Sequence, residues 1–519
     1  MVGSHMATSK KIICALSIFI LLFGVLYSSA LRLTPLENSG YMRLSSSSEI
    51  SAFLSLLAHH YPSAEKVSIA ESELGNPVDA LLVSSNLSLF KNRMRDDDKL
   101  TVLFLGSQHG SEPSGAEALL RVATDILKGT LGPYLDEMNF IFIPNGNPDG
   151  RNLKSRKNAH NIDINRNYMI LTESESRGII DALNRWSPDV VLDVHEAPAL
   201  KKKSLARQGY LMDFEAQFEA ANNPNVDQDI RSYSFRRILP QLIERVQAKG
   251  LPAQRYIKSI HSIHRPVTNG GLSLEILRNM AGMMGAFSFL LENRRDPSTG
   301  AYPTPLNIHA RVSKQYLCIT TFLESIRPHR DAISAISRKA RMKWKNPHNK
   351  APLYLASRYV TDPSNPKMTL PLRRIDTGES IKHTFRYHGD VEARLPLTTL
   401  PAAYIVTSHQ KFIQDILARH HVKYRRAKKS STFVAHVKRI KRRIFEKINA
   451  RQSQTRYVFK ERKMDYQLRR GDLVVDLNQP AKRLIPLFLE LQSAGSIFNN
   501  DRYTNLVQDQ KDFFVLSAE

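Results

Sequence analysis

The chain has 519 residues, of which 74 are Lys or Arg and 49 are Asp or Glu, so its formal net charge is +25. A hydrophobic fraction of 42% excludes a mainly disordered chain, and a mean hydropathy of −0.33 excludes a protein with many membrane spans. At roughly 150 residues per domain, this length predicts two to four domains.

The positive charge is concentrated in the last third of the chain. Residues 1–340 carry 39 basic and 33 acidic side chains, whereas residues 341–519 carry 35 and 16. Within the second group, residues 421–470 hold 18 Lys or Arg and 3 Asp or Glu. An interaction with a polyanion would therefore concern one segment, and we expect no specific nucleic-acid partner.

The N-terminus has the pattern of an export signal. Lys10 and Lys11 precede an apolar run over residues 12–27, and small residues lead to a predicted cleavage site after Ala30. Because this run is shorter than the roughly 20 residues of a spanning helix, it favours a cleaved signal over a retained anchor or a buried helix. We treat residues 1–30 as a signal peptide or membrane anchor and predict an exported protein, periplasmic or secreted.

Apolar runs alternate with amphipathic stretches after the signal. Strands are expected at 100–105, 140–144 and 190–194, and helices at 116–127 and 175–186. This alternation is typical of an α/β domain, which we place at residues 45–335. The polar segment 201–235 is predicted to be a long surface excursion.

A second domain is expected after a boundary near 335–350. Shorter apolar runs punctuated by Pro, Gly and Asp indicate a smaller, basic, β-rich domain over 350–519. Residues 421–470 fit either a helix or strands. Their charge fits either a solvated face or attachment to an anionic surface, such as lipid head groups or lipopolysaccharide.

Candidate metal ligands follow two of the expected strands, where sites in open α/β sheets collect. His109 and Glu112 lie three residues apart after the first strand, and His195 ends the strand at 190–194. Two imidazoles and a carboxylate suit zinc, which in catalytic sites takes three protein ligands and keeps a position open for water.

The segment between these ligands supplies turn residues and fixed positive charge. Asn147-Pro148-Asp149-Gly150 is a turn sequence, and Arg156 and the pair Asn165-Arg166 follow it. Arginine offers a planar fork of donors that suits carboxylates and oxyanions. The sequence therefore places anion-binding groups between the predicted metal ligands.

Taken in order, His-x-x-Glu, Asn-Pro-Asp-Gly, Arg-Lys-Asn, Asp-Ile-Asn-Arg-Asn and Asp-Val-His resemble the zinc carboxypeptidase family, peptidase family M14. Runs near 400–406, 416–422 and 470–481 resemble the C-terminal module of its large bacterial branch. The resemblance implies a mixed-sheet α/β catalytic domain flanked by helices, a β-rich C-terminal domain and one zinc ion. It implies hydrolysis of the C-terminal peptide bond of a substrate with a free carboxylate.

The resemblance also implies a role for each candidate residue. His109, Glu112 and His195 fall on the zinc ligands, Arg156 on the arginine that polarises the scissile carbonyl, and Asn165 with Arg166 on the pair that grips the terminal carboxylate. Glu292, at the end of the apolar run 287–292, falls on the general base, with Glu275 and Glu196 as competitors. Arg278 is a candidate for substrate specificity, and Tyr210 and Tyr256 are candidates for the family's capping tyrosine.

Three other functions remain open on the sequence. A zinc amidohydrolase or deacylase of small acylated amino acids would share the His-x-x-Glu and distal His, but such proteins lack the Asn-Pro-Asp-Gly turn. A cell-wall peptide substrate fits within the peptidase interpretation. An inactive, non-enzymatic member that binds an anionic surface through its basic domain is the third.

Overall fold

A computed structural model of the chain describes residues 33–92, 99–295, 308–346, 348–428, 430–449, 452–500 and 503–519. The predicted signal or anchor at residues 1–30 lies outside the described residues. Among the described helices, none is both long enough and apolar enough to cross a membrane.

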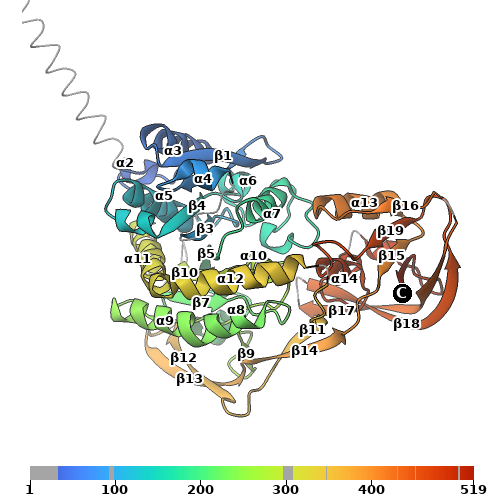
Figure 1. The fold of residues 1–519 in the computed structure, drawn as a ribbon. Helices are drawn as coiled ribbons and strands as arrows, with labels where there is room; N and C mark the ends of the chain where they lie inside the picture. The colour runs from blue at the N-terminus through green and yellow to red at the C-terminus, as the bar shows by residue number, and fades with distance from the viewer. Residues whose placement is uncertain are drawn as a thin grey trace, which may run out of the picture.

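The first part of the chain is built on a central sheet with helices around it (Figure 1). This mixed sheet has eight strands in the order β1-β2-β4-β3-β5-β10-β7-β8. Its four central strands are parallel, β2 and β7 run antiparallel to their central neighbours, and β1 runs antiparallel to β2. The strands are β1 (Ala64–Glu71), β2 (Pro77–Val83), β3 (Leu100–Gly106), β4 (Met138–Ile143), β5 (Val190–Pro198), β7 (Ala216–Ala220), β8 (Ala253–Arg255) and β10 (Phe287–Arg295).

Helices cover both faces of this sheet. One apolar core joins a face of the sheet to α3 (Ser47–His60), α5 (Ser114–Leu127), α9 (Leu239–Ala248), α11 (Ile308–Ile326) and α12 (Arg330–Lys345). The opposite face packs against α7 (Ser174–Trp186) and α10 (Leu277–Met283). Shorter helices are α2 (Pro35–Asn38), α4 (Leu87–Lys91), α6 (Pro148–Asn152) and α8 (Gln228–Tyr233). The predicted α/β class with a mixed sheet is confirmed.

The sequence predicts the central elements because their burial is uniform. Every residue of β3 and of β4 is buried, as expected for strands covered on both faces. In contrast, the predicted surface excursion at 201–235 is wrong in its middle, because β7 is a fully buried strand between β10 and β8. Its polar residues, Gln217 and Glu219, hide the apolar signal of a short strand.

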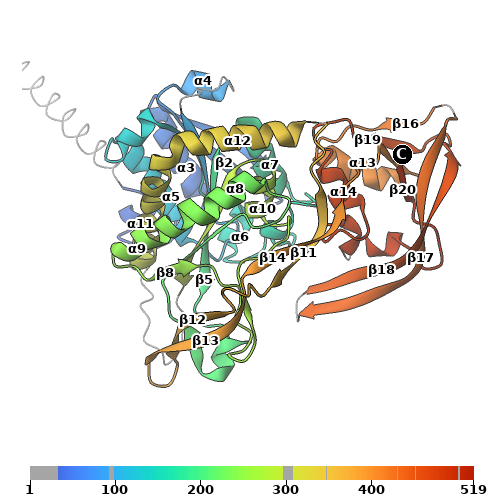
Figure 2. The ribbon, with the colours of Figure 1, turned by 60° about the horizontal axis from the view of Figure 1, so that its bottom comes forward.

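The last part of the chain is rich in strands. A six-stranded sheet has the order β16-β19-β15-β20-β17-β18, and its longest pair is the hairpin of β17 and β18 (Figure 2). Within 421–470, the described segments Arg425–Arg426, Thr432–Asn449 and Gln452–Gln467 are therefore strands and not a helix. The elements are β15 (Ala403–Val406), α13 (Gln410–Arg419), β16 (Arg425–Arg426), β17 (Thr432–Asn449), β18 (Gln452–Gln467), β19 (Leu473–Asp476), α14 (Leu484–Leu489) and β20 (Val515–Ala518).

The two parts of the chain are joined by shared strands and a shared core. A four-stranded sheet combines β6 (Tyr210–Met212) and β9 (Val267–Thr268) with β12 (Lys367–Arg374) and β13 (Ser380–His388). The strands β11 (Leu353–Val360) and β14 (Asp390–Leu397) form a separate pair. The apolar core that contains the buried face of α7 also includes residues of the C-terminal part, among them Leu353, Tyr404 and Val475. The boundaries at 45–335 and 350–519 stay predictions.

Candidate metal centre

The loop after β3 carries the first two predicted ligands and is fixed by close backbone packing. Ser107 takes a positive φ of 49° directly after the strand, which turns the chain toward the sheet edge. At Gly110 a Cβ atom would lie 1.9 Å from the carbonyl carbon of Gly150, so only glycine fits there. The Asn147 side chain ties the two segments together, accepting from Gly150 N at 2.9 Å and donating to the Gln108 carbonyl at 3.1 Å.

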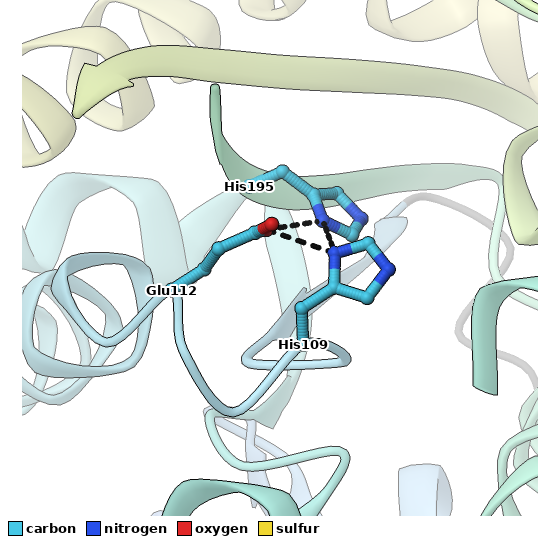
Figure 3. A group of neighbouring side chains, drawn as sticks. All are labelled: His109, Glu112 and His195. Atoms are coloured by element: carbon cyan, nitrogen blue, oxygen red, sulfur yellow. Dashed lines mark hydrogen bonds and ion pairs between the residues drawn. The ribbon is translucent and has the colours of Figure 1, made fainter. Parts of the chain in front are cut away.

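His109, Glu112 and His195 converge at the carboxyl ends of β3 and β5 (Figure 3). Glu112 Oε2 lies 3.0 Å from His109 Nδ1 and 2.9 Å from His195 Nδ1, and the two nitrogens are 3.1 Å apart. In a tetrahedral zinc site with bonds of about 2.0–2.1 Å, neighbouring ligand atoms lie about 3.3 Å apart. The three atoms therefore have the spacing of three corners of a zinc tetrahedron.

The charges around this cluster also fit a cation. Two ring nitrogens that face each other repel unless a proton or a metal ion lies between them. Burial opposes the charge on Glu112, yet the two imidazoles hold its pKa well below the usual range. Burial likewise opposes the charge on His195, but Asp193 and Glu112 raise the pKa of its imidazole well above the usual value. The donor set, two imidazoles and one carboxylate, is one that zinc prefers.

Two aspartates orient the histidine rings from behind. Asp163 Oδ1 lies 3.1 Å from His109 Nε2, and Asp193 Oδ1 lies 2.8 Å from His195 Nε2. Metal binding through Nδ1 requires the proton on Nε2, which then donates to the aspartate. Asp193 also accepts from Gln108 Nε2 at 2.6 Å, and Tyr168 donates to Gln108 Oε1 at 2.6 Å.

Sequence reasoning did not single out these supporting residues. One signal for Asp193 was present, since it is a charged residue inside the apolar strand 190–194 and lies two positions before His195. Because side chains alternate along a strand, the two point to the same face. Gln108 and Tyr168 carry no such signal, because their contact joins residues 60 positions apart.

Glu292 and Arg156 flank the cluster. Glu292 pairs in register with His195 on the neighbouring parallel strand, so the two side chains emerge on the same face of the sheet. Burial raises the pKa of the Glu292 carboxyl, and His195 opposes that rise. Arg156 lies with Nη1 3.3 Å from Glu112 Oε1 and with Nε 3.0 Å from Asp163 Oδ2. The structure brings both residues to the centre.

Asn165 and Arg166 lie in the same layer but differ in exposure. Asn165 is buried, with Nδ2 3.2 Å from His195 Nε2 and Oδ1 accepting from Leu277 N at 2.9 Å. Arg166 is exposed, and its Nη1 donates to the Asn165 carbonyl at 2.5 Å. Asn165 thus contacts a predicted ligand, while the Arg166 guanidinium faces solvent. Their grip on a substrate carboxylate stays a prediction.

The remaining candidate residues differ in where they lie relative to the metal centre. Glu196 points away from the centre, with Oε1 2.8 Å from Arg311 Nε, as expected of a residue next to a ligand on a strand. Glu275 accepts from the Ser273 hydroxyl at 3.3 Å. Tyr210 belongs to β6 in the four-stranded sheet, whereas the pKa of Tyr256 responds to Glu292, Arg166 and Arg156 and is raised mainly by burial. Arg278 is buried in α10.

Lys201 is a further neighbour of the centre that sequence reasoning assigned to the surface. It is the first of three consecutive lysines, and Lys202 and Lys203 are exposed as expected. Burial lowers the pKa of Lys201, while Glu292 and Glu112 act on it in the opposite direction. Of the three lysines, Lys201 therefore places its charge near Glu292 and Glu112.

Residues 50–202 match the zinc carboxypeptidase family. The chain is 28% identical over 228 residues to "Probable carboxypeptidase 2" of Arthroderma benhamiae, covering 43% of this chain and 43% of that protein. It is also 28% identical over 228 residues to "Carboxypeptidase 2" of Trichophyton rubrum, covering 43% of this chain and 42% of that protein. The chain therefore aligns with less than half the length of these relatives.

Among solved structures, a metallo-carboxypeptidase from Burkholderia cenocepacia is 17% identical, with a TM-score of 0.41. The alignment covers 55% of this chain and 70% of that chain.

Proposed function

We propose that this chain, which carries a zinc carboxypeptidase domain matched over residues 50–202, is a zinc-dependent metallocarboxypeptidase that hydrolyses C-terminal peptide bonds. The observation that carries the proposal is the convergence of His109 Nδ1, Glu112 Oε2 and His195 Nδ1 within 3.1 Å of one another. Glu292 and Arg156 lie beside these atoms, as general acid-base and electrophilic groups for amide hydrolysis must.

One zinc ion held by His109, Glu112 and His195 would lower the pKa of a bound water and polarise the scissile carbonyl. Glu292 then takes the proton from the attacking water and returns it to the leaving amine, a role that its raised pKa favours. Arg156 stabilises the developing oxyanion. Arg166, aided by Asn165, binds the terminal carboxylate of the substrate.

The test compares peptides that end in a free carboxylate with the same peptides amidated at the C-terminus. The full chain with one equivalent of zinc should release single residues from the acids and act poorly on the amides, because an amide gives Arg166 no charge to bind. Equal cleavage of acids and amides would contradict the exopeptidase proposal. Muropeptides and N-acylated amino acids belong in the same panel, because their hydrolysis in place of ordinary peptides would favour the cell-wall or deacylase alternative.

We also propose that the hairpin of β17 and β18 attaches the enzyme to an anionic surface. Two of its exposed cations have acidic partners, Arg462 with Asp512 and Lys463 with Glu519, each at 2.7 Å. Lys441, Arg442 and Lys460 are exposed and have no acidic partner within 4.0 Å among the residues that the structure describes. Co-sedimentation with phosphatidylglycerol vesicles, lost at high salt and in a Lys441→Gln/Arg442→Gln/Lys460→Gln variant, is the expected result. Equal binding to neutral vesicles would contradict it.

We propose an exported location, periplasmic or secreted, on the strength of the N-terminal sequence. Mature protein recovered from the producing cells should begin near residue 31 if the signal is cleaved. A full-length protein in the membrane fraction would support the anchor at residues 12–27, and a full-length protein in the cytoplasmic fraction would contradict export.

A further inference from the structure

Arg278 is a buried cation without an acidic partner. Only 2% of its surface is exposed, and among the described residues no carboxylate lies within 4.0 Å of its guanidinium. Its Nη2 donates to two neutral oxygens, Asn222 Oδ1 at 3.2 Å and the Gly271 carbonyl at 2.8 Å. Its Nε has no hydrogen-bond partner. Burying a charge without an opposite charge beside it costs free energy, which indicates that a ligand supplies the missing partner of Arg278.

The nearby charged groups leave a net positive charge. Glu219 is fully buried on β7, but it is paired with Arg255, whose Nε lies 3.2 Å from Glu219 Oε1. Glu219 Oε2 also accepts from Gly270 N at 3.3 Å. A Cβ atom at Gly270 would lie 2.8 Å from Arg278 Nη2, so the guanidinium rests directly on this backbone. Glu219 is therefore paired with Arg255 and does not neutralise Arg278.

Arg278 is connected to the metal centre through Leu277 and Asn165. Its neighbour Leu277 donates its backbone N–H to Asn165 Oδ1, and Asn165 Nδ2 lies 3.2 Å from His195 Nε2. Tyr256 lies near both Arg278 and the metal centre, because the charges of Glu292, Arg278 and Arg166 all shift the pKa of its hydroxyl. Arg278 and the proposed reacting groups therefore lie within electrostatic reach of one side chain.

The C-terminal part of the chain holds the loop on which Arg278 rests. Tyr359 of β11 donates to the Gly270 carbonyl at 2.6 Å, and Asn222 Nδ2 donates to the Tyr359 hydroxyl at 2.9 Å. Tyr387 of β13 also bonds Asn269 Oδ1. These contacts fix the backbone of residues 269–271, so the guanidinium is held in place without a charged partner.

We infer that Arg278 is the residue that selects the C-terminal side chain of the substrate, and that it selects an acidic one, glutamate or aspartate. The inference rests on the proposed carboxypeptidase function. A side-chain carboxylate supplies both the negative charge and the acceptor that Nε lacks. A neutral isostere such as glutamine supplies an acceptor but no charge, and a lysine side chain is repelled by Arg278.

The test pairs acetyl-Ala-Glu with acetyl-Ala-Gln, which differ only in that charge, and adds acetyl-Ala-Leu and acetyl-Ala-Lys. With the zinc-loaded full chain, kcat/KM should be about 10- to 100-fold higher for the Glu peptide than for the Gln peptide, the range for a charge-assisted hydrogen bond. Arg278→Met should bring the ratio near one, while Arg278→Lys keeps part of it. Arg265→Met, at an exposed arginine in the preceding loop, should leave the ratio unchanged.

A binding measurement separates this inference from the proposed function. Calorimetric titration of a Glu292→Gln variant should give a tighter Kd for acetyl-Ala-Glu than for acetyl-Ala-Gln, by the same 10- to 100-fold. Equal affinities, or a preference that Arg278→Met leaves intact in a folded, zinc-binding protein, would overturn the inference. Cleavage of the Leu or Lys peptide at the rate of the Glu peptide would overturn it while leaving the carboxypeptidase function standing. Tight Glu binding with no hydrolysis of any peptide would support the inference and contradict the function.

Discussion

The α/β region before residue 346 and the β-rich region after it use charged residues in different ways. In the first, Glu112, Asp163, Asp193, Arg156 and Glu292 gather around one centre, where the carboxylates face the imidazole rings of His109 and His195 and the guanidinium of Arg156. In the second, the ion pairs are mostly exposed ones such as Arg462–Asp512, and the buried Glu490 is paired with Lys438 and accepts from Tyr404. The difference teaches that net charge does not locate the metal site, because the candidate ligands lie in the region that carries the smaller share of the positive charge.

The largest effect is expected from Glu292→Gln. Because the amide cannot accept the proton, kcat should fall by about 10²- to 10⁴-fold, while zinc content stays at one equivalent. Peptide hydrolysis and metal analysis of the same sample measure the two quantities. The matched change in the other region, Glu461→Gln at an exposed position of β18, should leave kcat within twofold. A similar loss in both variants would erase the distinction between the regions.

Lys438→Met should be the most destabilising change in the β-rich region. Lys438 Nζ lies 2.8 Å from Glu490 Oε2 and both side chains are 7% exposed, so the variant leaves a buried carboxylate whose remaining side-chain donor among the described residues is Tyr404. The expected loss is about 3–5 kcal/mol of unfolding free energy. Arg462→Met removes an exposed ion pair with Asp512 and should leave the unfolding free energy nearly unchanged. Denaturant unfolding of both variants measures the contrast, and equal losses would contradict it.

Asp193→Asn tests whether the carboxylates behind the ligands belong to the site. The amide cannot balance a metal-bound imidazole as a carboxylate does, so zinc affinity should fall by about 10- to 100-fold. Competition with a chelator of known affinity measures the change. Asp181→Asn, on the exposed face of α7 beside His421, is the control and should bind zinc as the unaltered protein does. An unchanged affinity in Asp193→Asn would assign that residue to the fold alone.

His420 gives the smallest effect and concerns the contact between the regions. Its ring stacks on Phe488 with centroids 5.5 Å apart, and Nε2 donates to the Met169 carbonyl at 2.8 Å. Burial, together with Arg419 and His421, lowers its pKa to about 4. The unfolded chain therefore takes up a proton below about pH 6.5 that the folded chain refuses until about pH 4, so stability is complete above pH 6.5 and falls below it.

Thermal unfolding between pH 7 and pH 5 measures this dependence, with a contribution from His420 of about 1–2 kcal/mol at pH 5. His420→Gln keeps a donor for the Met169 carbonyl but cannot be protonated, so its stability should change less over this range. Parallel pH curves for the two proteins would show that His420 does not titrate at the contact.

The local sequence pattern was enough to predict a strand or helix where uniform burial or helical periodicity alone decided the element. The strands at 100–105, 140–144 and 190–194 and the helices at 116–127 and 175–186 are confirmed within a few residues, because uniform burial or helical periodicity decides them. β7 was missed because Gln217 and Glu219 interrupt a five-residue strand, and their burial depends on partners such as Arg255, 36 residues away from Glu219. The basic hairpin at 432–467 could be placed only after strand pairing was known, since its apolar spacing also fits a helix.

By itself the sequence predicted the strands at 100–105, 140–144 and 190–194, the helices at 116–127 and 175–186, and the candidate ligands His109, Glu112 and His195, because these follow from spacing along a short stretch of chain. Only the tertiary structure decided that Asp193 and Asp163 stand behind the histidines, that Asn165 contacts His195, and that Arg278 is buried without a carboxylate. These facts depend on contacts between distant segments and on exclusion of water. A linear pattern contains the charges, but only packing fixes which of them lie together and which remain unbalanced.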